Sequence, residues 1–327
     1  MTDIAMIEAA AARLEGRARR TPLLSSPFLD EIAGRRVLVK AEALQHTGSF
    51  KFRGGWSAVS ALDPATRDRG VFAYSSGNHA QGVAYAARLH GVPAVILMPA
   101  DAPRLKIANT RALGAEVVTY DRARDDRDAL GARLARDRGL TLIKPFDDPQ
   151  VIAGQGTVGL EIAEQAAAAG VSKADVLVCC GGGGLTSGIA LALEGRAPGL
   201  RARPVEPEGY DDVARSLASG RIERNARISG SLCDAIITPA PGEMTFPIMQ
   251  RLCGPGVVVP ERDCLRAMAL AFTRLKLVLE PGGAIALAAA LLHPETVQGE
   301  AVIAVASGGN VDAGLFARVL GDFGEAG

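Results

Sequence analysis

The sequence predicts an α/β protein of two domains, each with a mainly parallel, twisted sheet flanked by helices. Short apolar and β-branched runs alternate with longer alanine-rich helical patterns along the 327 residues, an alternation typical of parallel sheets covered on both faces. Strand-helix units crowd into residues 70–147, whereas residues 148–327 carry longer glycine-rich loops. We therefore expect a small domain over residues 70–147, inserted into a large domain formed by residues 1–69 and 148–327, with the active site in the cleft between them.

The expected strands are short apolar runs, the pattern of strands buried on both faces. They cover residues 36–40, 70–75, 93–98, 115–120, 140–145, 174–180, 202–208 and 301–307. Helical patterns fill the intervals, over residues 79–91, 104–114, 126–139, 156–170 and 264–276. Several of these helices end on glycine after a basic last turn, which is typical of a helix C-terminus.

Charge and composition narrow the class of ligand. Thirty-six basic residues balance thirty-six acidic ones, so no net field favours nucleic acid or an anionic membrane. The longest apolar stretches, such as residues 282–292, are about half as long as a membrane-spanning helix. We expect a cytoplasmic protein that binds a small molecule. The five cysteines form no CxxC pair, which favours reduced, buried thiols over a disulfide frame or a zinc site.

Four consecutive glycines, Gly181, Gly182, Gly183 and Gly184, separate a predicted strand from a predicted helix. Without Cβ atoms, the backbone N–H groups of such a loop can converge on an anion at the helix N-terminus. The loop therefore predicts a phosphate site, with a tight turn that binds nothing as the alternative.

A dinucleotide site is the rival interpretation of this loop. Glu206 follows at a strand end, where a Rossmann fold places its ribose-binding acid. The third glycine of that pattern is missing, because the frame falls on Thr186 or Ser187, and no Lys-Ser or Lys-Thr follows the glycines as in a Walker loop. The pattern favours a phosphate monoester, and an NAD-binding oxidoreductase is the weaker alternative.

Three more polar turns lie next to predicted strands or helices. Residues 75–79, Ser-Ser-Gly-Asn-His, bring small donors to the start of a helix, where a carboxylate binds well, although an ordinary N-cap has the same composition. Ser307 follows the last predicted strand, and Glu280 precedes a Pro-Gly-Gly turn. Because ligands bind at the carboxyl ends of parallel strands, these turns are expected to line one site.

Lys51 lies within residues 46–55, HTGSFKFRGG, just after a predicted strand. Taken alone, a lysine at such a junction is either a solvated charge or a reactive amine, and the solvated charge is the more common case. The rest of the chain has to decide between them.

Six motifs, taken in order, resemble those of the fold-type II pyridoxal-phosphate enzymes, and more narrowly the threonine/serine dehydratase and serine racemase family. They are HTGSFKFRGG, SSGNHAQGVA, VIAGQGTVGLEI, GGGGLTSGIA, LEPGGAIA and SGGNVD, within a match from about residue 20 to about residue 315. The resemblance implies the tryptophan synthase β-like fold. It also implies that Lys51 forms the Schiff base with pyridoxal 5′-phosphate and takes the Cα proton of the substrate, with the neighbouring Arg53 helping to lower its pKa.

The other cofactor contacts follow from the same resemblance. They are Phe50 against one face of the ring, Asn78 at the 3-hydroxyl, Gly181 to Gly184 and Leu185 at the phosphate, and Ser307 at the pyridine nitrogen. A neutral hydroxyl at the nitrogen leaves the ring unprotonated, which favours β-elimination.

The implied reaction is the dehydration and deamination of a 3-hydroxy L-amino acid, most simply L-threonine or L-serine, to a 2-keto acid and ammonia. The substrate carboxylate is expected on the loop of Ser75, Ser76, Asn78 and His79. Many dehydratases of the family have alanine where Ser76 stands, whereas serine racemases use a serine there to deliver a proton to the opposite face. Serine racemase activity is therefore an alternative.

Other departures from the family pattern concern the substrate. Lys144 stands where the family usually has histidine, and it is either a surface substitution or an added cation for an acidic substrate such as threo-3-hydroxyaspartate. Residues 229–246 also depart from the usual sequence, which leaves the substrate preference open.

A divalent cation and a homodimer complete the expectations. Glu206, Asp212 and the carbonyl of Tyr210 resemble the cation site of the racemase branch, and hard oxygen ligands of this kind suit Mg²⁺ or Ca²⁺.

Overall fold

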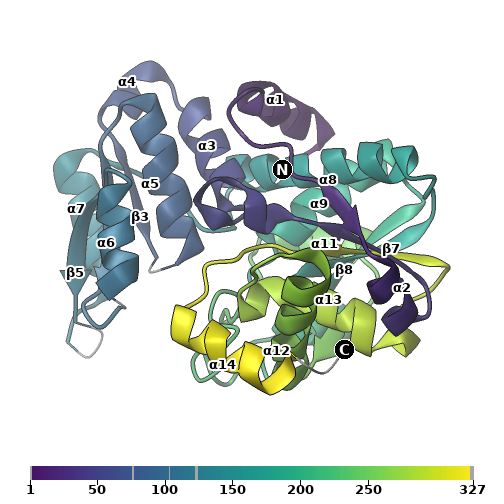
Figure 1. The fold of residues 1–327 in the computed structure, drawn as a ribbon. Coiled ribbons are helices and arrows are strands. Elements are labelled where there is room, and N and C mark those ends of the chain that lie inside the picture. Colours follow the sequence, from purple (N-terminus) through teal and green to yellow (C-terminus); the bar gives the residue numbers. More distant parts are fainter. Residues whose placement is uncertain (1, 76, 103, 122–123, 325–327) are drawn as a thin grey trace.

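The computed structural model describes residues 2–75, 77–102, 104–121 and 124–324. Within them the strands form a six-stranded sheet in the order β1-β2-β10-β7-β8-β9 and a four-stranded sheet in the order β5-β4-β3-β6 (Figure 1). Neighbouring strands are parallel in both sheets, except for β1 against β2. The predicted fold class, with mainly parallel sheets flanked by helices, is confirmed.

All the strands predicted from the sequence are present. The six-stranded sheet contains β1 (Leu23–Ser25), β2 (Arg36–Lys40), β7 (Ala174–Cys179), β8 (Leu200–Pro207), β9 (Val257–Val259) and β10 (Ala301–Val305). The four-stranded sheet contains β3 (Val71–Tyr74), β4 (Ala94–Pro99), β5 (Glu116–Tyr120) and β6 (Thr141–Leu142). The sequence did not reveal β1 and β9, because three residues are too few to show a periodic pattern.

The helices alternate with these strands. They are α1 (Ile4–Leu14), α2 (Pro27–Ala33), α3 (Lys51–Ala61), α4 (Pro64–Asp68), α5 (Asn78–His90), α6 (Arg104–Ala112), α7 (Arg127–Arg138), α8 (Pro149–Ala168), α9 (Gly184–Arg196), α10 (Asp212–Ser219), α11 (Thr245–Leu252), α12 (Glu261–Leu270), α13 (Pro281–Leu292) and α14 (Ala313–Phe323). Short helical turns are η1 (Glu42–Leu44), η2 (His46–Gly48), η3 (Ala271–Leu275) and η4 (Pro294–Thr296). The helix predicted over residues 264–276 is divided, because α12 ends at Leu270 and the π-helical η3 follows.

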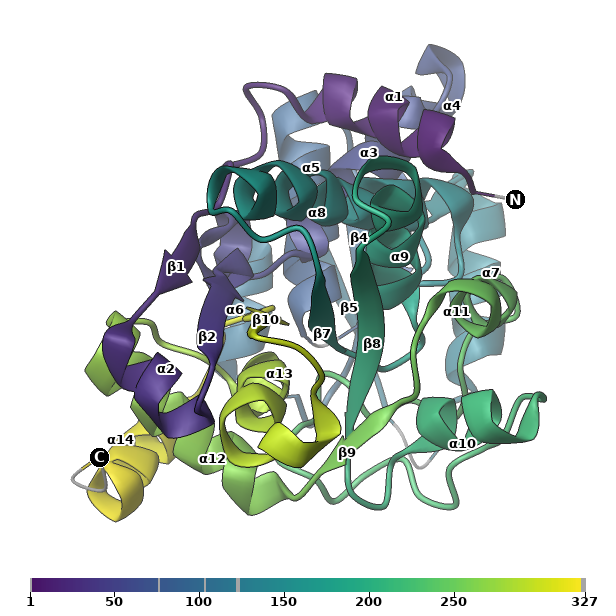
Figure 2. The same ribbon diagram turned by 90° about the vertical axis from the view of Figure 1, so that its right-hand side faces the viewer.

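The six-stranded sheet lies between two layers of helices, with α8 and α9 on one side and α2, α12 and α13 on the other (Figure 2). Helix α13 is apolar on every side and almost wholly buried, as expected for a helix inside a core. No helix among the described residues has both the length and the apolar character needed to span a membrane.

Helix α3 lies between the two sheets, packed on α5 and on α8 (Figure 1). Its buried Phe52 and Trp56 belong to the same hydrophobic cluster as Val71 and Ile96 of the four-stranded sheet. The helix therefore shares a core with residues that follow it in the chain. The division into a small domain of residues 70–147 and a large domain stays a prediction.

Candidate active site

Lys51 is the first residue of α3, and the segment before it is attached to the segment after β10. The Phe50 N–H donates to the Ser307 carbonyl at 3.1 Å, and Ser49 forms an isolated β-bridge with Gly308. Two motifs about 250 residues apart in the sequence therefore meet at the carboxyl edge of the six-stranded sheet, as predicted for the ligand site of a parallel sheet.

The glycines after Lys51 allow α3 to approach its neighbours closely. A Cβ atom on Gly55 would lie 3.0 Å from the backbone of Gly82 in α5, and one on Gly154 of α8 would lie 2.5 Å from the Arg53 carbonyl oxygen. Any side chain at these crossings would push the helices apart. The Gly-Gly pair of HTGSFKFRGG thus fixes where α3, and with it Lys51, sits between α5 and α8.

The amine of Lys51 has no acidic partner. Its Nζ donates to the Pro145 carbonyl at 2.7 Å and lies 5.2 Å from the centroid of the Phe50 ring, and among the described residues no carboxylate forms an ion pair with it. Although part of the residue is accessible to solvent, burial of the amine lowers the pKa of Lys51 to about 8, with the nearby Cys179 sulfur opposing the shift. The amine is therefore about half neutral at pH 8 and keeps an appreciable neutral fraction near pH 7.

Arg53 does not act on Lys51 as the sequence suggested. Its guanidinium is buried and forms ion pairs with Glu42 and Glu161, each at 2.7 Å, so its charge is compensated there. Helix periodicity explains the geometry, because side chains two positions apart leave a helix in different directions. The expectation that Arg53 lowers the pKa of Lys51 is wrong; burial of the amine lowers it.

The glycine loop forms the N-terminus of α9. Gly183 has φ +89°, a left-handed conformation that L side chains rarely adopt. Among the described residues, no acceptor binds the backbone N–H groups of Gly182, Gly183, Gly184 or the 4%-exposed Leu185. Unsatisfied N–H groups at the start of a thirteen-residue helix suit an anion, and a phosphate in particular.

Phe146 packs against this loop. A Cβ on Gly182 would lie 2.3 Å from the Phe146 ring, and one on Gly184 would lie 3.0 Å from Phe146 Cα. Phe146 was not predicted as a site residue, since only its proximity in the folded chain marks it.

Ser307 is 4% exposed and follows β10. Its backbone is held at both ends, because its N–H donates to the Gly283 carbonyl and its carbonyl accepts from Phe50. Its hydroxyl oxygen accepts a hydrogen bond from the thiol of Cys179, with Sγ and Oγ 3.0 Å apart. Cys179 is the last residue of the neighbouring strand β7. The sequence did not predict it as a site residue.

The loop of residues 75–79 is described except for Ser76, which lies outside the described residues. Ser75 Oγ accepts from the Gly77 N–H at 3.1 Å, so its own O–H remains a donor. Asn78 donates through Nδ2 to Glu280 Oε1 at 2.6 Å, and its Oδ1 accepts from Asn310 at 2.7 Å. One N–H of the Asn78 amide is left for a ligand.

His79 is buried, and its Nε2 lies 2.8 Å from the Ile143 carbonyl oxygen. Burial and the nearby Lys51 amine lower the pKa of His79 to about 3, so the ring is neutral. Since Nε2 donates to the carbonyl, Nδ1 is an acceptor, and it has no partner among the described residues. The ring of His79 therefore has no N–H left for a substrate carboxylate, whereas its backbone N–H, in the first turn of α5, has no acceptor among the described residues. The role of His79 in binding the carboxylate stays a prediction.

Glu280 is a buried acid that has no opposite charge in contact among the described residues. Burial raises its pKa to about 7, opposed by the hydrogen bond from Asn78. The loop that contains Glu280 was expected from the sequence to line the site. In the structure, the Glu280 carboxyl group accepts a hydrogen bond from Asn78.

The residues predicted to bind a cation also meet. Glu206 and Asp212 are fully buried, and burial, together with their proximity to each other, raises the pKa of Glu206; burial also raises that of Asp212, to about 6. Glu206 accepts from the N–H groups of Val213 and Ala214, whereas Asp212 Oδ2 has no partner among the described residues. No group of three or more His, Cys, Asp or Glu side chains is positioned for a metal within the described residues, so a cation here needs the Tyr210 carbonyl and water as further ligands.

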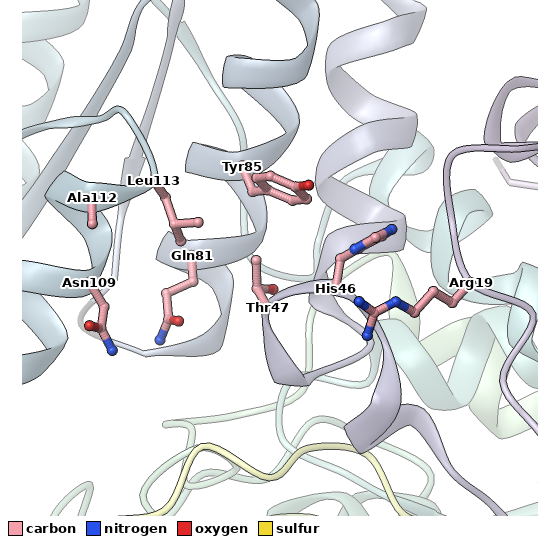
Figure 3. A pocket seen from close by; sticks show the side chains of 8 residues that line it. All are labelled: Arg19, His46, Thr47, Gln81, Tyr85, Asn109, Ala112 and Leu113. Carbon is pink, nitrogen blue, oxygen red and sulfur yellow. The ribbon is translucent and has the colours of Figure 1, made fainter.

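A cavity of about 380 Å³ lies beside the site (Figure 3). Its lining residues are Arg19, His46, Thr47, Gln81, Tyr85, Asn109, Ala112 and Leu113. Residues of η2, which precedes Lys51 in the chain, and of α5, which begins at Asn78, thus line the cavity. Lys51 and Asn78 themselves do not line it.

The described site fits pyridoxal phosphate by its chemistry. A buried, unpaired amine suits an aldehyde, free N–H groups at the start of α9 suit a phosphate monoester, and the hydroxyl of Ser307 suits a ring nitrogen. The family model of the pyridoxal-phosphate dependent enzymes matches residues 14–308. The chain belongs to this family.

Relatives within the pyridoxal-phosphate dependent enzymes cover almost the whole chain. An L-threo-3-hydroxyaspartate ammonia-lyase of Pseudomonas sp is 43% identical over 312 residues, which is 95% of this chain and 96% of the relative. A serine racemase of Schizosaccharomyces pombe is 38% identical over 96% of each chain. The solved structure of a threonine deaminase from T.th. matches with a TM-score of 0.89 at 46% identity, over 95% of this chain and 99% of that one.

Proposed function

We propose that the protein is an ammonia-lyase that uses pyridoxal 5′-phosphate to convert a 3-hydroxy L-amino acid, L-threonine or L-serine, into a 2-keto acid and ammonia. The observation that carries the proposal is the Lys51 amine, which is buried, has no acidic partner within the described part of the chain, and has a pKa lowered to about 8. Relatives named as ammonia-lyases and a threonine deaminase structure support the same class of reaction.

The residues assigned to the cofactor surround Lys51. When bound, pyridoxal phosphate supplies an electron sink that stabilises the negative charge left at Cα after proton loss. The residues that would hold it are Phe50, Lys51, Asn78, Gly181, Gly182, Gly183, Gly184, Leu185 and Ser307.

Lys51 is the residue assigned to proton transfer. A neutral amine accepts a proton, and the lowered pKa keeps much of the Lys51 amine neutral near pH 8. Loss of the Cα proton and of the β-hydroxyl removes water from the substrate. Hydrolysis of the released product adds water again and yields the 2-keto acid and ammonia, so the atoms balance.

The substrate carboxylate is assigned to the N-terminus of α5. The free hydroxyl of Ser75, the backbone N–H groups of Asn78 and His79 and the positive end of the helix dipole favour an anion there. The ring of His79 is assigned to holding the loop on the Ile143 carbonyl.

Threo-3-hydroxyaspartate is an alternative substrate, and racemisation is an alternative reaction. The exposed Lys144 adjoins Pro145, whose carbonyl binds the Lys51 amine, and a second carboxylate on threo-3-hydroxyaspartate would find a cation nearby. The 43% identical relative is named for that substrate.

Serine racemase activity rests on Ser76 as the base on the opposite face, and loss of racemisation with retained elimination in Ser76→Ala would support that role.

A divalent cation, Mg²⁺ or Ca²⁺, is assigned to Glu206, Asp212 and the Tyr210 carbonyl. Burial raises the pKa of both acids, and the nearby Asp212 raises that of Glu206 further, so a cation that compensates both charges would bind favourably. Addition of Mg²⁺ should raise the melting temperature of the EDTA-treated protein, and Asp212→Asn should abolish this shift. An equal shift in both proteins would reject the site.

A homodimer is the proposed assembly. Phe28 of α2 is 53% exposed and Phe272 of η3 is 38% exposed, and Arg274 lies over the Phe28 ring at 4.7 Å. Exposed aromatic residues favour a protein interface. Light scattering of the purified protein measures the mass, and Phe28→Glu should shift a dimer towards monomer.

The decisive experiment is spectroscopic. The protein with added pyridoxal phosphate should show a visible absorption band that borohydride abolishes, and keto-acid release should follow for some member of a panel of 3-hydroxy amino acids that includes 3-hydroxyaspartate. Absence of the band in protein with Lys51 intact would reject the proposal. Tight NAD binding without any effect of pyridoxal phosphate would support the oxidoreductase alternative.

A further inference from the structure

The hydrogen bond between Cys179 and Ser307 joins the ends of two neighbouring strands. β7 and β10 are parallel, with Ala304 opposite Leu177, so the chain segments that follow both strands emerge at the same edge of the sheet. Both residues are 4% exposed, and their Sγ and Oγ atoms are 3.0 Å apart.

The Cys179 thiol is the donor of this hydrogen bond. Burial raises the pKa of the thiol to about 11, so the sulfur keeps its proton near neutral pH and can donate it. A hydroxyl oxygen that accepts this proton still has one O–H of its own. Because the backbone of Ser307 is held by Gly283 and Phe50, only rotation about its Cα–Cβ and C–O bonds remains to be fixed.

Cys179 also lies close to Lys51. The Lys51 amine and the Cys179 sulfur are near enough for each to alter the pKa of the other. The thiol therefore contacts Ser307 and lies near Lys51, two of the residues assigned to the cofactor. It lies at the carboxyl end of β7, the strand that leads into the glycine loop.

We propose that Cys179 is a positioning residue, which holds the Ser307 hydroxyl so that its own proton points to the ring nitrogen of the cofactor. The proposal rests on the proposed function, in which Ser307 binds that nitrogen. Without the thiol, the hydroxyl is free to turn among staggered rotamers, and its buried lone pair loses a donor. A serine at position 179 would keep a donor in almost the same place.

Infrared spectroscopy of the cofactor-free protein tests the hydrogen bond itself. The difference between wild type and Cys179→Ala isolates the S–H stretching band of Cys179. Ser307→Ala should move this band to higher frequency, because the thiol loses its acceptor. Cys264→Ala is the control, since Cys264 is also buried but its thiol faces Pro260, and it should leave the band in place. A Cys179 band that does not move in Ser307→Ala overturns the proposal.

Cofactor binding tests the positioning role. Titration with pyridoxal phosphate, followed by its absorbance, should give an affinity about five- to tenfold weaker in Cys179→Ala, the loss expected for one buried hydrogen bond. Cys179→Ser should restore it to within about twofold, and Cys264→Ala should not change it. Wild-type affinity in Cys179→Ala, or no rescue by serine, overturns the role. Wild-type protein that binds no cofactor would overturn the proposed function and the positioning role together, while the infrared result would still stand.

Discussion

Two clusters of buried titratable groups adjoin α3, and they are built on different principles. The paired-charge cluster consists of Lys40, Glu42, Arg53 and Glu161, in which each basic group meets a carboxylate within 2.5–2.7 Å. The reaction site consists of Lys51, His79, Cys179 and Glu280, which meet only neutral partners.

The two buried lysines make the contrast plain. Burial lowers the pKa of Lys40 as well, but the carboxylates of Glu161 and Glu42 oppose it, and its Nζ also donates to Gln165 and the Thr21 carbonyl. Among the residues that the structure describes, the Lys51 amine meets no carboxylate and donates to the Pro145 carbonyl. A buried charge with a partner stays charged and stabilises the fold, whereas a buried group without one shifts towards its neutral form and becomes reactive.

The largest expected effect is on catalysis and comes from the reaction site. Lys51→Met should lower keto-acid release at least about 10³-fold, as expected when the group that transfers a proton is lost. The free energy of unfolding should not fall, because the amine has no ion pair to lose. Urea unfolding beside a keto-acid assay measures both, and a destabilised variant would show that Lys51 belongs with the structural charges.

Arg53→Met should have the largest effect on stability. It leaves Glu42 buried without its partner, which typically lowers the free energy of unfolding by about 3–5 kcal/mol. Urea unfolding at pH 7 measures the change. The double variant Arg53→Met with Glu42→Gln is the control and should recover part of the loss. A change of under about 1 kcal/mol would mean that the cluster resembles a surface ion pair.

The raised pKa of Glu280 predicts that the stability of the fold changes with pH in the opposite direction to that expected from a paired carboxylate. Its pKa is raised from 4.5 to about 7 in the folded protein, so the folded state binds the proton more tightly than the unfolded state does. Its stabilising contribution is full below about pH 4.5 and is lost as the pH rises through 7, by on the order of 3 kcal/mol at 1.36 kcal/mol per pKa unit. Glu280→Gln should make the melting temperature less dependent on pH over this interval. Parallel curves for variant and wild type would contradict the raised pKa.

The smallest effect is expected from an ion pair on the surface. Arg20 and Glu164 are 2.8 Å apart, with side chains 57% and 65% exposed. Arg20→Ala should change the free energy of unfolding by under about 1 kcal/mol, and added salt should reduce that further. If Arg20→Ala lowered the free energy of unfolding as much as Arg53→Met does, burial would not explain the difference between the surface ion pair and the paired-charge cluster.

Much of the fold could be predicted because its elements are periodic and long. The apolar runs of β7 and β10 and the all-round apolar pattern of α13 depend on local spacing alone. The short strand β9 and the π-helical η3 could not be predicted, since their lengths are set by neighbouring elements.

By itself, the sequence determined the alternation of the longer strands and helices along the chain, the glycine loop before α9, and Lys51 and Ser307 as candidates, because each of these depends on local composition or on a motif. The tertiary structure alone decided that Arg53 turns to Glu42 and Glu161, that Phe146 covers the glycine loop, and that Cys179 donates to Ser307. These contacts join residues up to 128 positions apart. They depend on strand order, register and helix crossings, which no local pattern encodes.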